Sequence, residues 1–193
     1  VLTAHSASPL LTLVLLLLAL FLAWSYSSPP LYLNRHGLGE ACGAVLVPVL
    51  TTVVAFQVHT GQVALLPLLA TAPLACFQFA MLLSVNFPDA AGDEQVGKRT
   101  LVVICGPAQG SRLLVAALAL AYLLLPALIL LGLPAQAGLA VLLTSPIALW
   151  QVWRMRRGAA VDPTQWDALA FWSIGLLMAA AMLETAAFIL LWP

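Results

Sequence analysis

Long apolar runs alternate with short polar segments along the whole chain of 193 residues. A helix that crosses a membrane needs about 20 consecutive, mostly apolar residues. The pattern therefore predicts an all-α integral membrane protein with six transmembrane helices, over residues 9–27, 41–59, 63–85, 112–132, 135–153 and 168–192. The longer polar connections then lie at residues 28–40, 86–111 and 154–167. We expect a single transmembrane helical domain over residues 1–193.

The fifth run is the least regular of these, because Pro146 interrupts it. Proline removes a helical hydrogen bond, but neighbouring helices can satisfy the freed carbonyl group within a membrane. We therefore predict a kinked span here. Short turns are expected at Gly61 and around Gly132 and Pro134.

Composition agrees with a membrane protein and excludes other classes. Hydrophobic residues make up 63% of the chain and charged residues 7%, whereas a soluble domain carries about 25% charged residues. The net charge is zero and no basic tract occurs, so nucleic acid is not an expected partner. The lipid bilayer is the expected surroundings of most side chains.

The basic residues define an orientation for the predicted spans. They all fall in the three long connections or at their edges: Arg35, Lys98, Arg99, Arg112, Arg154, Arg156 and Arg157. Short loops on the cytoplasmic side of membrane proteins carry an excess of lysine and arginine. The three long connections are therefore predicted to be cytoplasmic, with both termini of the chain outside.

The segment between the third and fourth runs concentrates acidic residues. Asn86, Asp89 and Asp93 lie at positions i, i+3 and i+7, so they share one face if the third helix continues. Pro88 makes a kink or a restart of the helix an alternative. Carboxylate and amide oxygens suit Mg²⁺, and Lys98 with its neighbour Arg99 can meet phosphate oxygens. The competing interpretation is a solvated segment with internal ion pairs.

Two stretches of this chain resemble the UbiA family of membrane prenyltransferases. The string N-x-x-D-x-x-x-D-x-x-x-x-K-R-T-L, at 86–101, is similar to the second aspartate-rich motif of that family. Its "GKRTL" ending resembles the branch that makes menaquinone-type quinones, with 1,4-dihydroxy-2-naphthoate as acceptor. The stretch "YSSPPLYLNRHGLGE", at 26–40, looks like the family's Tyr-Ser-x-Pro-Pro segment followed by Gly-Leu-Gly-Glu.

The resemblance implies an architecture and an activity. Family members have nine spanning helices and two aspartate-rich motifs that bind Mg²⁺ and a polyprenyl diphosphate. Their reaction transfers the polyprenyl group to an aromatic acceptor in quinone biosynthesis. The six predicted spans correspond to the last six helices of such a bundle, and the first aspartate-rich motif has no counterpart in this sequence.

The resemblance also implies roles for individual residues. Asp89 and Asp93 match the metal ligands and catalytic aspartates, with Asn86 as an auxiliary ligand. Lys98 and Arg99 would contact the diphosphate. Tyr26 and Arg35, in the other motif, would help to place the acceptor or the diphosphate. Glu94 departs from the family, which often has arginine at this position.

Three explanations of the missing motif stay open. The chain is part of a longer product, or another polypeptide supplies the missing N-terminal half, or the protein is a relative that kept the fold for another purpose. In the last case it would be a non-catalytic subunit of a larger membrane complex, binding lipid, quinone or pigment. Glu184, inside the last run, is a second functional candidate; the alternative is a protonated or hydrogen-bonded side chain facing the bundle.

Overall fold

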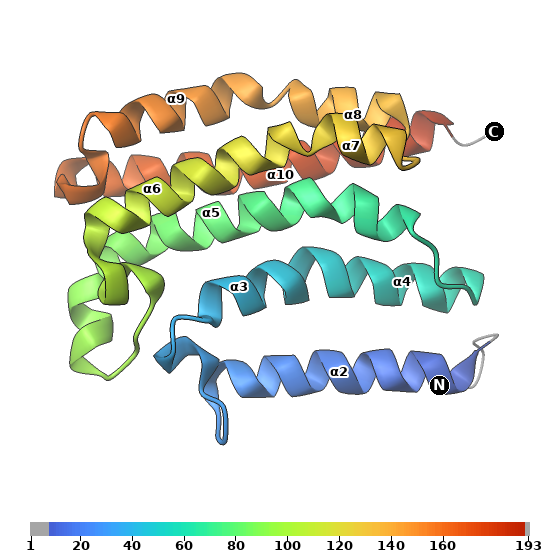
Figure 1. Cartoon of the computed structure of the whole chain (residues 1–193), viewed down its shortest axis with the longest axis horizontal. Coiled ribbons are helices and arrows are strands. Elements are labelled where there is room, and N and C mark those ends of the chain that lie inside the picture. Colours follow the sequence, from blue (N-terminus) through green and yellow to red (C-terminus); the bar gives the residue numbers. More distant parts are fainter. Residues whose placement is uncertain (1–7, 192–193) are drawn as a thin grey trace.

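In the computed structural model of the chain, residues 8–191 are described. Long helices lie side by side with their axes nearly parallel, as Figure 1 shows. Helix accounts for 84% of the structure, and the described residues contain no strand. Five helices in this part of the chain are long and apolar enough to cross a membrane, or six when one bent pair is counted as a span. The predicted all-α membrane architecture is confirmed.

Each predicted span has a counterpart among these helices. Their bounds are α2 Pro9–Ser27, α3 Gly39–Ala44, a π-helical turn η2 Val45–Leu50, α4 Thr51–Thr60, α5 Leu66–Gln95, α6 Leu101–Leu123, α7 Leu125–Leu130, α8 Ala135–Leu142, α9 Ser145–Arg156 and α10 Trp166–Leu191. Short 3₁₀ helices η1 Leu33–Arg35, η3 Ala159–Val161 and η4 Pro163–Gln165 lie in the connections. The second span joins α3, η2 and α4, and the fourth joins α6 and α7. Residue 192, the predicted end of the last span, lies outside the described residues.

Two of the spans deviate from regular helix at a proline. The second contains Pro48 inside the π-helical turn η2, where the wider turn accommodates the missing N–H group. The fifth bends by 40° between α8 and α9, just before Pro146, as the sequence predicts. At this bend the hydroxyl of Thr144 donates to the carbonyl of Val141 at 2.7 Å and lies 2.9 Å from the hydroxyl of Tyr122. The bend is therefore attached to α6.

The sequence predicts a polar connection over residues 86–111, but most of this segment is helical in the structure. Helix α5 continues through Pro88 to Gln95, and α6 begins at Leu101. Only residues 96–100 are non-helical before α6. Gly106, at φ 78° and ψ 166°, then breaks α6, so that its first turns form a separate piece visible at the left of Figure 1. Hydropathy ended the predicted span at residue 85 because it reports contact with lipid. Helix formation also suits the Ala, Glu and Gln residues that follow.

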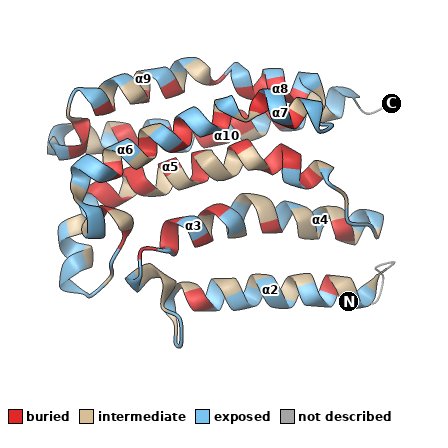
Figure 2. Cartoon of the chain, viewed as in Figure 1, coloured by how far each residue is buried: buried red, intermediate tan, exposed pale blue. Residues whose placement is uncertain are grey.

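The core lies where α5 packs against α6 and α10, and where α10 packs against α8. Its largest fully buried side chains include Phe77, Leu83, Leu114, Leu169 and Leu176. Helix α2 lies at the margin of the bundle and buries few residues, as Figure 2 shows. Its Thr12 hydroxyl donates to Gln57 of α4 at 2.7 Å, a polar contact of the kind that joins helices within a membrane.

Apolar side chains cover much of the molecular surface. Leu130 is 89% exposed, Leu10 75% and Phe171 67%. Exposed apolar patches of this extent mark contact with a membrane or with another protein. The helices that carry them are long enough to cross a bilayer, so lipid is the natural cover for this surface.

The connections that carry most of the basic residues gather at one end of the bundle. The segments after α2, between α5 and α6, and between α9 and α10 lie together at the left of Figure 1. The start of α2 and the end of α10 lie at the opposite end. The cytoplasmic position of the first end stays a prediction from the charge pattern.

Candidate functional site

The polar face predicted at the end of α5 exists. Because the helix is continuous through Pro88, Asn86, Asp89 and Asp93 share one side of it. Asn86 is buried, the side chain of Asp93 is 13% exposed, and Asp89 is exposed. The face therefore begins inside the bundle at Asn86, and of its three polar residues only Asp89 is exposed.

The chain reverses direction directly after α5 and brings a cation back to this face. Gly97 takes a left-handed conformation at φ 74°, and the backbone N–H of Lys98 donates to the carbonyl of Asp93 at 2.9 Å. The ammonium group of Lys98 lies 2.8 Å from Oδ2 of Asp93. This ion pair is the single one within 4 Å in the part of the chain that the structure describes. The ion pair places Lys98 beside Asp93, as the interpretation with internal ion pairs also predicts; a role of either residue in ligand binding stays a prediction.

The electrostatic surroundings of Lys98 include residues of both motifs. Partial burial alone would lower the pKa of Lys98. The hydrogen bond and the negative charge of Asp93 act in the opposite direction, with smaller contributions from Tyr26 and Asp89, and the net result is a raised pKa. Residues of both motifs therefore contribute to the electrostatic surroundings of this lysine.

Backbone hydrogen bonds join the two motifs directly. The N–H of Arg99 donates to the carbonyl of Asn34 at 3.0 Å, and the N–H of Gly37 donates to the carbonyl of Arg99 at 3.0 Å. Gly37 has φ 71°, and a Cβ atom added there would lie 2.7 Å from Cδ1 of Ile104. Glycine suits this contact chiefly because of its left-handed conformation, and a larger residue would also force the end of the Ile104 side chain to move.

Glu40 ends the Gly-Leu-Gly-Glu stretch, but sequence analysis gave it no role of its own. It is 3% exposed, and its Oε1 accepts hydrogen bonds from the side-chain amide of Asn86 at 2.9 Å and from the backbone N–H of Leu101 at 2.8 Å. The second oxygen, Oε2, is buried without a hydrogen-bond partner. One carboxylate thus connects the start of α3, the polar face of α5 and the first turn of α6. The sequence did contain one signal for this role. Glu40 is a carboxylate at the start of an apolar run, and a buried charge requires hydrogen-bond partners.

The two arginines of the predicted site are placed differently from the lysine. The side chains of Arg35 and Arg99 are exposed, and neither forms an ion pair within the described region. The guanidinium of Arg35 lies 4.5 Å from the ring centre of Tyr32, a residue in the left-handed conformation at φ 43°. Arg99 contributes its backbone to the junction of the motifs. A role for either side chain in substrate binding stays a prediction.

The donor set suits a cation that is shared with a phosphate ligand. No group of three or more His, Cys, Asp or Glu side chains that could hold a metal occurs among residues 8–191. The site offers two carboxylates, from Asp89 and Asp93, and the second already carries a lysine. Mg²⁺ usually binds through one or two carboxylates together with substrate phosphates and water. The residues present fit that mode and do not form an all-protein cage.

Glu184 lies apart from this site. It is 3% exposed on the face of α10 that enters the bundle, and its Oε1 has no hydrogen-bond partner. The structure thus confirms a carboxyl group that faces the bundle. Glu184 lies on α10, whereas Asp89 and Asp93 lie on the last turns of α5, and both helices are long and apolar enough to span a membrane.

Comparison with known proteins gives one family and one distant relative. The sequence model described as the UbiA prenyltransferase family matches residues 1–175. The chain is also similar to the 1,4-dihydroxy-2-naphthoate octaprenyltransferase of Bacillus subtilis (strain 168), with 25% identity over 130 residues. That alignment covers 67% of the chain but 42% of the relative, so the chain matches less than half of the relative's length. No solved structure gives a significant match.

Proposed function

The chain belongs to the UbiA prenyltransferase family, and from this premise we propose that it takes part in Mg²⁺-dependent prenyl transfer. The donor would be a polyprenyl diphosphate and the acceptor an aromatic ring in quinone biosynthesis. The observation that carries the proposal is the ion pair of Lys98 with Asp93, which shares one side of α5 with Asp89 at one end of an apolar helical bundle. Such a site offers charge for a diphosphate headgroup and an apolar surface for its hydrocarbon chain.

The diphosphate is proposed to bind between the end of α5 and the segment that follows it. Asp89 and Asp93 would hold Mg²⁺, which supplies the positive charge that stabilises the leaving diphosphate. Lys98 is held in place by Asp93 and stays protonated, so it can donate hydrogen bonds to phosphate oxygens. Glu40 fixes the amide of Asn86, which leaves the carbonyl oxygen of Asn86 as an acceptor toward the cation or its water.

The reaction itself breaks the bond between the allylic carbon and the diphosphate oxygen. The bonding electron pair leaves with the diphosphate, whose charge the site compensates. An electron-rich carbon of the acceptor then forms the new carbon–carbon bond, and the ring loses a proton. By resemblance to the relative from Bacillus subtilis, we propose a naphthoate-type acceptor, with Tyr26 and Arg35 near it.

Two aspartates can hold one side of a diphosphate but cannot enclose it. Family resemblance implies a second aspartate-rich motif opposite the first, and this sequence contains one such motif. We therefore propose that a further polypeptide segment completes the site, either from a longer product or from a partner in a larger membrane complex.

The test is prenyl transfer in membranes that contain the chain, measured with and without Mg²⁺. Asp89→Asn removes one proposed metal ligand and should lower the rate at least about a hundredfold, the loss typical of an important electrostatic group. Glu94→Gln is the matched control, because Glu94 is exposed on the same helix and should leave the rate within about twofold. Equal rates for wild type and Asp89→Asn would refute the metal role. Stoichiometric recovery in a larger complex with no turnover would favour the non-catalytic subunit instead.

A further inference from the structure

An apolar groove runs between α6 and α9 on the outer side of the bundle. Two adjoining cavities, of about 380 and 590 Å³, form it, and both are lined by Val115, Ala119 and Arg156. Leu123 and Leu149, along the smaller cavity, are 75% and 67% exposed. The groove is therefore open along its length to the surroundings of the two membrane-spanning helices.

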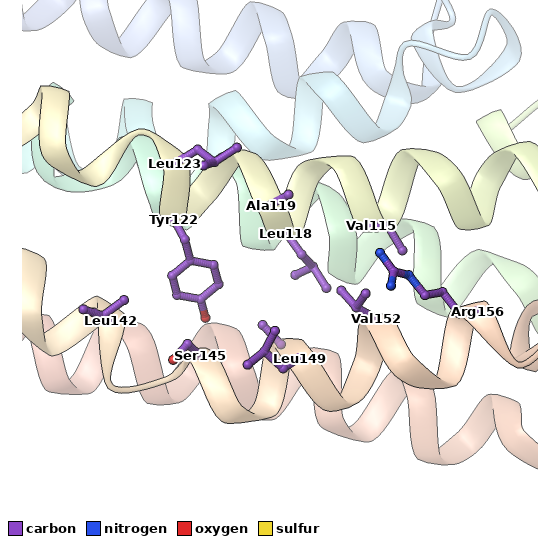
Figure 3. A pocket seen from close by; sticks show the side chains of 11 residues that line it. Val115, Leu118, Ala119, Tyr122, Leu123, Leu142, Ser145, Leu149, Val152 and Arg156 are labelled. Carbon is purple, nitrogen blue, oxygen red and sulfur yellow. The ribbon is translucent and has the colours of Figure 1, made fainter.

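Two arginines define one end of this groove. Arg112 of α6 and Arg156 of α9 both line the larger cavity, and no acidic residue lines either cavity. Figure 3 shows the guanidinium of Arg156 extending from α9 toward Val115 on α6. Neither arginine pairs with a carboxylate within the described residues; Arg112 meets only the amide oxygen of Gln109, at 3.1 Å. The end of the groove thus carries two positive charges without a protein counter-charge.

The neighbouring arginines do not share this position. The guanidinium of Arg154 lies 4.7 Å from the ring centre of Trp150 and its Nε donates to Gln165 at 2.7 Å. The guanidinium of Arg157 lies 4.3 Å from the ring centre of Trp153. Both are occupied by contacts within the chain and line neither cavity.

The rest of the groove is apolar. Tyr122 lies toward its far end, and its hydroxyl group is already bonded to Thr144 at 2.9 Å. The side chains between this end and Arg156 come from Val115, Leu118, Ala119, Leu149 and Val152, as Figure 3 shows. A ligand that fits has a hydrocarbon chain along the helices and an anionic group at the level where α9 ends.

We propose that this groove is a binding site for an anionic glycerophospholipid. The phosphate lies between Arg112 and Arg156, and one acyl chain lies along α6 toward Tyr122. Basic pockets between transmembrane helices, at the depth of the headgroups, recognise anionic lipids in this way. None of Asp89, Asp93 and Lys98 lines the groove, so this site does not depend on the proposed prenyl transfer.

The test is native mass spectrometry of the whole chain in a neutral detergent. Dioleoyl phosphatidylglycerol and dioleoyl phosphatidylcholine are titrated separately, so that the two lipids differ in headgroup charge and share their acyl chains. Wild type should retain phosphatidylglycerol at least about tenfold more strongly than phosphatidylcholine, since each arginine contributes about a fivefold gain in affinity for the anionic headgroup. The double variant Arg112→Gln/Arg156→Gln should lose this preference, whereas Arg157→Gln, an exposed arginine outside the groove, should keep it within about twofold.

A second variant tests the apolar part of the site. Ala119→Phe places a ring in the groove at an exposed position, so it should fold normally and weaken retention of both lipids several-fold. Equal retention of the two lipids by wild type, an unchanged preference in the double variant, or full retention by Ala119→Phe would each overturn the proposal. A phosphatidylglycerol-independent dimer whose formation masks the groove would also overturn it, because a second copy would then be the occupant.

Discussion

The side-chain amide of Asn86 donates a 2.9 Å hydrogen bond to the carboxylate of Glu40, a residue 46 positions earlier in the chain. The same carboxylate oxygen accepts from the backbone of Leu101 at 2.8 Å. Because Glu40 is 3% exposed, these bonds form away from water, where a lost partner is costly. The polar face of α5 is therefore oriented by a residue outside the aspartate-rich motif.

Removing the Glu40 carboxylate should destabilise the fold locally. Glu40→Ala leaves the amide of Asn86 and the N–H of Leu101 buried without an acceptor, at a cost of about 1–3 kcal/mol each. Thermal unfolding in detergent should show a clearly lower midpoint for this variant. Glu40→Gln keeps an acceptor oxygen and should lose less. Glu94→Ala, at an exposed position, is the control and should change the free energy of unfolding by less than about 0.5 kcal/mol; a midpoint for Glu40→Ala equal to that of this control would contradict the assignment.

The junction of the two motifs should depend on one glycine. Gly37→Ala places a methyl group 2.7 Å from Ile104 and requires a left-handed backbone for alanine, so it should destabilise the chain by about 1–2 kcal/mol. Gly92→Ala is the matched comparison, because it lies in α5 with no atom within 4 Å of the added Cβ. This second change should stabilise the chain by up to about 1 kcal/mol. Unfolding midpoints that move in the same direction for both variants would contradict the proposed dependence of the junction on Gly37.

The ion pair between Lys98 and Asp93 should persist across neutral pH. The pKa of Lys98 is raised in the folded chain above its unfolded value of about 10.4. Its contribution to stability is therefore fully present below the unfolded pKa and is lost only as the pH rises through the folded pKa. The difference in unfolding midpoint between wild type and Lys98→Gln should stay constant from about pH 6 to pH 9. If this difference in unfolding midpoint disappeared by about pH 9, Lys98 would be losing its proton at a lower pH than its raised pKa implies.

Much of the architecture was predictable from hydropathy. The six spans and the bend before Pro146 follow from apolar run length and from proline chemistry. The common face of Asn86, Asp89 and Asp93 follows from helical periodicity, provided that the helix continues. These features depend on local sequence and on the bilayer, so a single sequence contains the necessary information.

The parts that were not predictable depend on contacts between distant segments. Hydropathy placed residues 86–111 in a loop, because it does not distinguish a polar helix end from an irregular connection. Glu40 gave no local sign of its partners, which lie 46 and 61 residues away. Arg99 joins the motifs through its backbone, so its side chain is not needed and its residue type does not reveal the role.

Binding of inorganic diphosphate to the whole chain, measured by isothermal titration calorimetry with and without Mg²⁺, tests the central claim most directly. Wild type should bind diphosphate only when Mg²⁺ is present. Asp89→Asn/Asp93→Asn should weaken that binding at least about tenfold, and Glu94→Gln should leave it within about twofold. Equal Mg²⁺-dependent binding by wild type and the double aspartate variant would contradict a metal–diphosphate site at the end of α5.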